Sequence, residues 1–331
     1  MSNKVIKRRF AVLLVCTCLI TFMADHESKE NIIICSSAEQ FRNDELQRQL
    51  NEEFPQYSTT VMYMPTGKAA AKVYAEGPSS EVDILLSLET GYLHKIKEDL
   101  DDISGLSHIP YVEDMTPRDN DNLWVTWERY AGAIVVNDDI LEKYGLEAPQ
   151  SYEDLLKPEY KGLIAMPDPK SSGTGYLYFK NWVNTMGEQG AVDYMDKLYV
   201  NLKQLTESGS GPIKMLRQGE VAVGLGLTFQ AVNAINEGHP LSIIFPEEGS
   251  PYSLSGTAII KGHREKEGVE EIFEYMANEF FVYDKRHFSP EIVYEGQVNE
   301  VENYPQNVEY ADMTGIHDLQ DKERLLDLWK Y

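Results

Sequence analysis

The sequence predicts an α/β fold in which parallel sheets are covered by helices. Short apolar runs of strand length alternate with longer segments whose apolar residues recur at helical spacing. This alternation is typical of strand–helix–strand units, because consecutive parallel strands need a crossover connection. The 331 residues and the 42% hydrophobic share allow one large domain or two lobes with substantial cores. No internal repeat, low-complexity block or long linker interrupts the alternation.

The elements follow one another in a regular order along the chain. Apolar runs predict strands at 31–35, 59–64, 82–88, 132–136, 163–166, 221–227, 241–245 and 257–261. Helical spacing predicts helices at 38–54, 68–76, 92–100, 152–156, 176–186, 191–205, 212–218, 228–237 and 266–278. In the first helix, Phe41, Leu46, Leu50 and Phe54 form the apolar stripe that is expected to face a sheet.

The most informative segment is MPDPKSSGTGY, residues 166–176, which lies between an expected strand and an expected helix. The first turn of a helix has N–H donors without intrahelical partners and carries a partial positive charge. Ser171, Ser172 and Thr174 add hydroxyl donors, and Gly173 lets the backbone come close to a ligand. The segment predicts a cradle for a phosphate, a phosphonate or a carboxylate. An ordinary helix cap without a ligand is the alternative.

Three other expected helices begin in the same way. Ser36 and Ser37 precede the first helix, Thr66 and Gly67 precede the second, and Ser210 lies in the SGSGP segment before the helix at 212–218. In open α/β sheets, ligands bind beyond the carboxyl ends of the strands. Four helix N-termini that converge on one crevice would hold an anion with few fixed cations. Good capping chemistry at four separate places remains the alternative.

Composition and missing motifs argue against nucleic-acid binding and against common enzyme classes. The net charge is −24, whereas contact with nucleic-acid phosphates needs clustered Lys and Arg. A nucleophile elbow is absent because Glu207 precedes the SGSG run, and a P-loop is absent because Ala69 follows Gly67 and Lys68. No His-Glu-x-x-His motif and no Cys pair suited to zinc occurs. We therefore expect a binding protein without catalytic residues, cofactor or metal.

The N-terminus is typical of a targeting segment. Residues 1–24 carry four basic and no acidic residues, and Phe10 begins a run of 14 mostly apolar residues. Such a run is short for a membrane span and suits a signal peptide. Asp25 stands where a lipoprotein would have its Cys, but Cys16 and Cys18 in the apolar run leave a lipid anchor as an alternative. Phe22 is bulky where a cleavage site needs a small residue, so an uncleaved anchor is a further alternative. Cys35 is the only Cys beyond this segment, so no intrachain disulfide is expected.

Taken together, the motifs resemble those of the solute-binding proteins of bacterial ABC importers. The resemblance is to the branch that includes ferric-ion, phosphonate, sugar-phosphate, thiamine and polyamine receptors, and it covers nearly all of the chain beyond residue 30. Each motif is weak alone, and their order and spacing are specific. The matching stretches are 34–39, 64–67, 81–85, 131–137, 151–162, 171–176, 208–212, 219–224 and 249–262.

The resemblance implies a type 2 periplasmic-binding-protein fold with two lobes and crossing hinge strands. Residues 31–130 and 246–290 would form lobe 1, residues 131–245 would form lobe 2, and residues 291–331 would pack across both. The crossings are expected at 131–136 and 241–245. The ligand would lie between the lobes, and closure would present the protein to a membrane permease. A monomer that is exported to the periplasm or the outer face of the membrane is expected.

The same resemblance narrows the ligand. Ferric receptors of this branch share a Tyr-Tyr pair after the strand that here spans 219–225, and in this chain Phe229 and Gln230 stand in its place. Glu39 stands near the position where such receptors have a His. Iron is therefore less favoured than a phosphonate or a phosphate ester, which suits the Ser-Ser-Gly-Thr-Gly turn.

Other residues are candidates with two interpretations each. Arg129 is either a second anion contact or a surface charge. Glu89 either binds an amino group or a metal, or is a carboxylate that only marks the start of a helix. Trp124, Trp127 and Tyr130 stack on an organic or cationic ligand or belong to the core.

We expect a receptor for an organophosphonate or a phosphorylated solute. The expected ligand contacts are Ser36, Ser37, Thr66, Gly67, Glu89, Arg129, Ser171, Ser172, Gly173, Thr174, Ser210 and Phe229. One alternative is a ferric-ion or polyamine receptor that uses Glu89, Glu128 and aromatic residues. A hydrolase or transferase on the same scaffold, and a surface adhesin that has lost transport, are alternatives of other classes.

Overall fold

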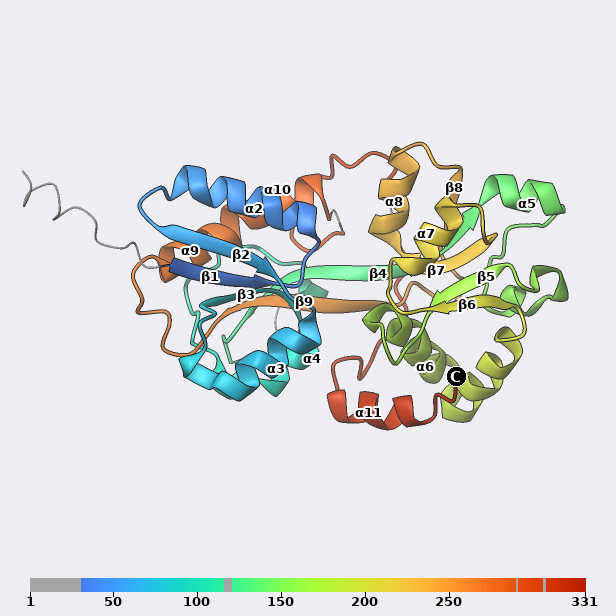
Figure 1. Ribbon diagram of the computed structural model, residues 1–331, viewed down its shortest axis with the longest axis horizontal. Helices are drawn as coiled ribbons and strands as arrows, with labels where there is room; N and C mark the ends of the chain where they lie inside the picture. The colour runs from blue at the N-terminus through green and yellow to red at the C-terminus, as the bar shows by residue number, and fades with distance from the viewer. Residues whose placement is uncertain (1–30, 116–120, 290, 306–307) are drawn as a thin grey trace, which may run out of the picture.

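The computed structural model describes residues 31–115, 121–289, 291–305 and 308–331 (Figure 1). The expected signal segment, with Cys16 and Cys18, lies outside these ranges. Within them, every helix is too short or too polar to cross a bilayer.

Strands and helices alternate over most of the chain. The strands are β1 (Asn31–Ser36), β2 (Ser58–Tyr63), β3 (Ile84–Glu89), β4 (Val125–Asn137), β5 (Ile164–Pro167), β6 (Leu202–Thr206), β7 (Val223–Leu227), β8 (Leu241–Ile244) and β9 (Tyr252–Ile259). The helices are α2 (Gln40–Glu53), α3 (Thr66–Glu76), α4 (Thr90–Lys95), α5 (Asp138–Tyr144), α6 (Gly173–Leu198), α7 (Gly211–Arg217), α8 (Thr228–Asn236), α9 (Val269–Tyr275), α10 (Phe281–His287) and α11 (Leu319–Asp327). A π-helical turn at Met276–Phe280 joins α9 to α10.

The strands form two groups that share one long strand. The order is β2-β1-β3-β9-β4-β7-β5-β6, with β8 also paired to β4. The first seven residues of β4 run beside β9, and the rest run beside β7 and β8. Figure 1 shows β4 and β9 passing between a lobe at the left and a lobe at the right. The α/β, two-lobe architecture predicted from the sequence is confirmed.

The return from the second lobe to the first follows β8. We expected a crossing at 241–245, and in the structure this segment lies along the second half of β4, with the chain reaching β9 through Ser250 and Pro251. Ser250 Oγ donates a hydrogen bond to the Gly132 carbonyl oxygen at 2.6 Å, and the Gly132 N–H donates to Pro251 at 2.7 Å. A Cβ at Gly132 would lie 3.0 Å from Pro251 Cγ and 2.7 Å from the Tyr178 hydroxyl, so β4 passes close to both the 250–251 segment and α6 at this glycine.

Each lobe has its own apolar core. In the first lobe, Trp127 is fully buried and packs against Phe280 and Phe281, so it belongs to the core and not to a ligand surface. In the second lobe, α6 contributes Phe179 and Trp182 to a core that also takes Trp329 from the C-terminal end of the chain.

One expectation about the elements is wrong, and two helices were missed. The helix expected at 191–205 ends at Leu198, and the strand β6 follows it. In the described sheet, β6 lies at the edge beside β5, so Lys203 and Gln204 are exposed. Their polarity made this segment resemble the exposed face of a helix. The sequence interpretation also missed α5 and the C-terminal helix α11.

Candidate functional site

A cavity of about 470 Å³ lies where the two lobes face each other. Its walls are the beginning of α3 and the beginning of α4 from the first lobe, the beginning of α6 from the second lobe, and α11 (Figure 1). The lining residues are Pro65, Thr66, Gly67, Lys68, Glu89, Tyr92, Lys95, Pro169, Lys170, Ser171, Ser172, Gly173, Leu319, Lys322, Glu323 and Leu326.

On the first lobe, the beginning of α3 is tied to the end of β3. Thr66 Oγ1 accepts a hydrogen bond from the Glu89 N–H at 3.1 Å, which fixes Glu89 at the carboxyl end of the strand. Gly67 leaves room for Tyr92, since a Cβ there would lie 3.3 Å from the Tyr92 hydroxyl. The first turn of α3 therefore opens into the cavity with Lys68 as its cation.

On the second lobe, the beginning of α6 closes the opposite side. Ser172 caps the helix by accepting a long hydrogen bond from the Gly175 N–H, at 3.5 Å. Ser171 Oγ donates to the Glu207 carbonyl oxygen at 3.0 Å. A Cβ on Gly173 would lie 3.8 Å from Glu89 Oε2, so the first turn of α6 and the Glu89 carboxylate face each other across the lobes.

Glu89 and Lys322 form the charged centre of the cavity. Lys322 Nζ lies 3.8 Å from Glu89 Oε1, and it lies over the rings of Tyr176 and Tyr92 at 4.8 and 5.6 Å from their centroids. Glu89 is only 6% exposed. Burial raises the pKa of the Glu89 carboxyl, and Lys322 opposes that rise. An ammonium group is thus held between a carboxylate and two aromatic faces.

The charge of the cavity is opposite in sign to that of the whole chain. Four lysines and two glutamates line it, in a protein whose net charge is −24. The beginnings of α3 and α6 add N–H groups that have no partner within their helices, together with the positive ends of two helix dipoles. This arrangement can hold an anion that bridges the lobes.

Half of the residues expected to contact the ligand line this cavity: Thr66, Gly67, Glu89, Ser171, Ser172 and Gly173. The others lie outside its lining. Ser36 is fully buried and donates to Asn43 Oδ1 at 2.6 Å, and Ser37 donates to the Met64 carbonyl oxygen at 2.9 Å. Both hydroxyls therefore serve the first βα turn.

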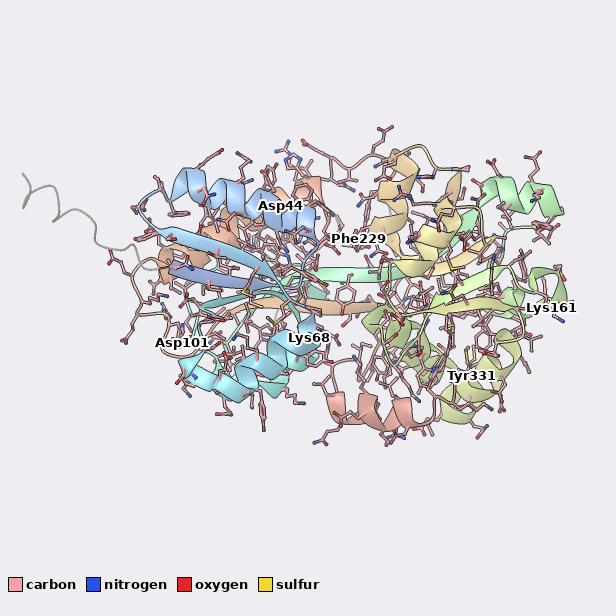
Figure 2. The ribbon with its side chains drawn as sticks, in the orientation of Figure 1. Asp44, Lys68, Asp101, Lys161, Phe229 and Tyr331 are labelled. Atoms are coloured by element: carbon pink, nitrogen blue, oxygen red, sulfur yellow. The ribbon has the colours of Figure 1, made fainter. Side chains whose placement is uncertain are left out.

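The remaining four candidates have other surroundings. Thr174 is buried against Gly209, and Ser210 is exposed with its hydroxyl 3.2 Å from that of Ser208. The Arg129 guanidinium lies 5.0 and 4.0 Å from the ring centroids of Tyr252 and Tyr310, respectively. Phe229 packs against the core of the second lobe at the start of α8, where Figure 2 shows it beside the gap between the lobes.

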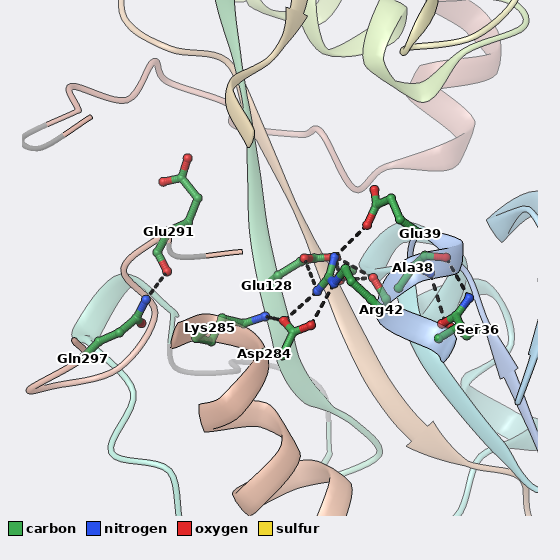
Figure 3. Close-up of polar contacts among 12 residues, drawn as sticks. Ser36, Ala38, Glu39, Arg42, Glu128, Asp284, Lys285, Glu291 and Gln297 are labelled. Atoms are coloured by element: carbon green, nitrogen blue, oxygen red, sulfur yellow. Dashed lines mark hydrogen bonds and ion pairs between the residues drawn. The ribbon is translucent and has the colours of Figure 1, made fainter. Parts of the chain in front are cut away.

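A buried ionic network lies beside β4 in the first lobe (Figure 3). Arg42 donates two hydrogen bonds to Asp284, at 2.8 and 2.7 Å, and pairs with Glu128 at 2.8 Å. Lys285 Nζ lies 2.6 Å from Asp284, and Glu39 pairs with Arg42 at 3.0 Å. Burial alone would raise the pKa of Asp284, but Arg42 and Lys285 outweigh it and the pKa is lowered. The network fixes the beginning of α2 against the crossing strand.

Sequence interpretation missed several residues of the cavity. Lys68 had a signal, because it follows Gly67 in the first turn of an expected helix. Lys170 had one too, because it directly precedes the Ser-Ser-Gly turn. Tyr92 and Lys322 had none, since only the tertiary fold brings α4 and α11 to the same place. Across the described ranges, no group of three or more His, Cys, Asp or Glu residues is placed to hold a metal ion.

Comparisons with known proteins agree with this architecture. A family model described as bacterial extracellular solute-binding protein matches residues 83–287, which is more than half of the chain. Among curated proteins, an uncharacterised protein of Haemophilus influenzae is 36% identical over 130 residues, and the spermidine/putrescine-binding periplasmic protein of Escherichia coli is 25% identical over 192 residues. These matches cover 39% and 56% of this chain, and 38% and 53% of the respective relatives, so the chain spans about half of their length or less.

Solved structures match over a larger part of the chain. The periplasmic binding protein AfuA of Actinobacillus pleuropneumoniae, with fructose-6-phosphate bound, has a TM-score of 0.74 at 22% identity. That match covers 91% of this chain and 98% of AfuA. The apo ferric ion-binding protein A of Pasteurella haemolytica has a TM-score of 0.72 at 19% identity, with coverage of 90% and 96%. At these identities the likeness concerns the fold.

Proposed function

Because this chain belongs to the family of bacterial extracellular solute-binding proteins, we propose that it is an exported receptor for a small phosphorus oxyanion. An organophosphonate or a phosphorylated solute would bind between the lobes and be delivered to an ABC permease, with the protein acting as a monomer. The export signal would be residues 1–24, and a lipid anchor is the alternative to a free protein. Lobe 1 would comprise residues 31–130 and 246–290, and lobe 2 residues 131–245.

The observation that carries this proposal is the concentration of positive charge in the cavity. Lys68, Lys95, Lys170 and Lys322 surround a space into which the first turns of α3 and α6 open. The remainder of the chain is strongly acidic, but exposed charges more than about 8 Å away are largely screened at physiological ionic strength. The local field therefore decides the sign of the ligand, and a phosphoryl group matches it.

Binding of such a group would join the two lobes. Its oxygens would accept hydrogen bonds from the beginning of α3 on one side and from Ser172 and Gly173 on the other. Each lobe alone supplies half of the donors, so affinity is highest in the closed arrangement, and the ligand shifts the population toward closure. Binding and hinge motion account for this site without a catalytic step.

A second candidate has its own supporting observation. Glu89, Tyr92 and Tyr176 surround an ammonium group, which here is that of Lys322. A ligand amine would find the same partners if Lys322 moved out. The Escherichia coli relative is named for binding spermidine and putrescine, so a polyamine is the alternative ligand. Ferric ion, named for the Pasteurella haemolytica neighbour, is the other alternative.

The experiment is a comparison of ligands by isothermal titration calorimetry and thermal unfolding. We expect methylphosphonate or fructose 6-phosphate to bind and to raise the melting temperature, since a ligand at 100 times its Kd stabilises by roughly 2.7 kcal/mol. Putrescine and ferric citrate are expected to have no effect. Stabilisation by putrescine or ferric citrate alone would refute the oxyanion receptor. Turnover of the phosphorylated probe would point to the enzyme alternative.

A further inference from the structure

The C-terminal helix α11 is fixed to the second lobe. Leu325 is fully buried in the core of that lobe, and Asp321 pairs with Lys180 of α6 at 2.9 Å. Beyond the helix, Trp329 packs on Phe179 with ring centroids 5.3 Å apart. These contacts are apolar as well as ionic, so α11 moves with the second lobe.

From that anchor, one side chain of α11 reaches the first lobe. Lys322 is 12% exposed, and its ammonium lies 3.8 Å from the Glu89 carboxylate between the rings of Tyr92 and Tyr176. It is therefore a cation that belongs to the chain and that occupies the place of a ligand amine. Glu89 is in turn the buried carboxylate that faces Gly173 at the beginning of α6.

We propose that Lys322 is the residue that sets the sign of the ligand's charge. With Lys322 in place, its ammonium neutralises Glu89 and leaves the helix N-termini and the other lysines to bind an oxyanion. Without its ammonium group, Glu89, Tyr92 and Tyr176 have no cation from α11, and they can bind an alkylammonium ligand instead. This inference rests on the proposed function, and it names the residue that separates the oxyanion receptor from the polyamine alternative.

The physical basis is the cost of placing like charges together in a buried site. Glu89 is too buried for solvent to screen it well, so an oxyanion beside the ionised carboxylate would be repelled. Burial already raises the pKa of this carboxyl, with Lys322 as the group that opposes the rise. Removal of Lys322 would leave the carboxylate with no cation from α11, and an external diamine would then supply one. Specificity is the difference between the affinity for an anion and the affinity for an amine, and removal of Lys322 should lower the first and raise the second.

The test compares wild type with Lys322→Met, which removes the ammonium group and leaves a flexible apolar side chain that a ligand amine can displace from Glu89. Calorimetry with methylphosphonate and inorganic phosphate as anionic probes, and with putrescine as the cationic probe, measures both affinities. We expect Lys322→Met to lose anion affinity by about tenfold or more, as for a lost charge-assisted hydrogen bond. We also expect it to bind putrescine, whereas wild type is expected not to. Lys322→Arg should restore anion binding.

Two further variants make the result decisive. Lys330→Met removes a lysine charge from the same C-terminal segment but outside the cavity lining, since Lys330 pairs with Asp196 at 2.8 Å. This variant should bind both probes like wild type. Glu89→Gln removes the carboxylate while Lys322 stays, and it should bind anions more tightly without gaining putrescine. Because Glu89→Gln leaves α11 intact, it tests the inference even if Lys322→Met does not fold.

The outcomes separate this inference from the proposed function. If wild type binds an anionic probe and Lys322→Met binds it equally well, or does not gain putrescine, the inference is overturned and the proposed function stands. Weaker anion binding by Glu89→Gln would also overturn the inference. If wild type binds putrescine and no anionic probe, both are overturned.

Discussion

At the scale of single residues, Arg42 is the side chain whose loss we expect to destabilise the fold most. Its guanidinium is 4% exposed at the side chain and binds Asp284, Glu128 and Glu39. Asp284 and Glu128 are buried, so loss of Arg42 would leave carboxylates in the protein interior with Lys285 as their one remaining cation in the network. Removing one partner of a buried ion pair costs about 3–5 kcal/mol, most of it from the charge left behind.

We therefore predict that Arg42→Met lowers the free energy of unfolding by about 3–5 kcal/mol, measured by urea denaturation. Arg48→Met is the matched control on the same helix. Arg48 also binds two carboxylates, Glu45 and Glu52, but its side chain is 51% exposed. Exposed ion pairs contribute about 0–1 kcal/mol, so Arg48→Met should cost no more than that. Equal losses in the two variants would show that burial of the network contributes nothing.

At the same scale, sequence and structure agree where the chemistry is local. Thr66, Gly67, Ser171, Ser172 and Gly173 were found because a strand followed by small polar residues marks a βα turn. Such a turn is placed by the sheet to which its strand belongs. Residues that depend on distant packing were not found, as Lys322 shows. The surroundings of Arg129 were not anticipated either, because nothing near it in the sequence indicates that its guanidinium lies over the rings of Tyr252 and Tyr310.

At the scale of elements, strands were easier to anticipate than the segment that packs across the lobes. The buried strands β3 and β7 are continuous apolar runs, as a sheet covered on both faces requires. The sheet is mixed and not purely parallel as expected, since β3 is antiparallel to β9 and β7 is antiparallel to β4. The edge strand β6 and the amphipathic helix α11 carry many exposed polar residues, so their type depends on partners far away in the sequence. A signal for α11 existed in Asp318, which caps the helix through the N–H groups of Gln320 and Asp321.

The joint between this C-terminal segment and the first lobe predicts a response to pH. His317 Nδ1 lies 2.6 Å from the hydroxyl of Thr90 at the start of α4. Burial, with a smaller contribution from His94, lowers the pKa of His317 from 6.5 to about 4. The unfolded chain therefore takes up a proton at a higher pH than the folded chain. Stability supplied by the neutral ring is fully present above about pH 6.5 and is lost as the pH falls toward about 4.

We predict that wild type loses up to roughly 3 kcal/mol of stability over that range through this group, whereas His317→Gln loses less. Gln keeps a hydrogen-bonding group near Thr90 but does not titrate. Thermal unfolding at a series of pH values measures the difference. His239→Gln is the control, since His239 accepts a hydrogen bond from Arg217 in the second lobe and does not contact this joint. Parallel pH profiles for wild type and His317→Gln would contradict the assignment.

At the scale of the whole molecule, the arrangement of charge and hinge predicts that ligand and shape are coupled. Two strands, β4 and β9, pass between the lobes, and so does the chain after α10: Val293 lies in the core of the first lobe, and Met313 lies in the core of the second. Around α4, the segment that contains α11 contacts the first lobe through His317, Leu319 and Lys322. The contacts around α4 involve few side chains and border cavities, so they can be broken and formed again without exposing a core. A phosphoryl ligand would add donors from α3 and α6 that act only when both lobes are near. A ligand with such a difference in affinity between two shapes must shift their populations.

Small-angle X-ray scattering tests this coupling directly. We predict that the radius of gyration falls when methylphosphonate or fructose 6-phosphate saturates the protein, because the ligand-free protein samples more open arrangements of the lobes. The same concentration of chloride serves as the control for ionic strength. Ser172→Ala combined with Lys68→Met should weaken this contraction, since it removes one contact from each lobe while leaving both cores intact. A saturating ligand that binds by calorimetry but leaves the radius of gyration unchanged would mean that the site is formed in advance. A permease could then not distinguish the ligand-bound protein from the free protein by closure of the lobes.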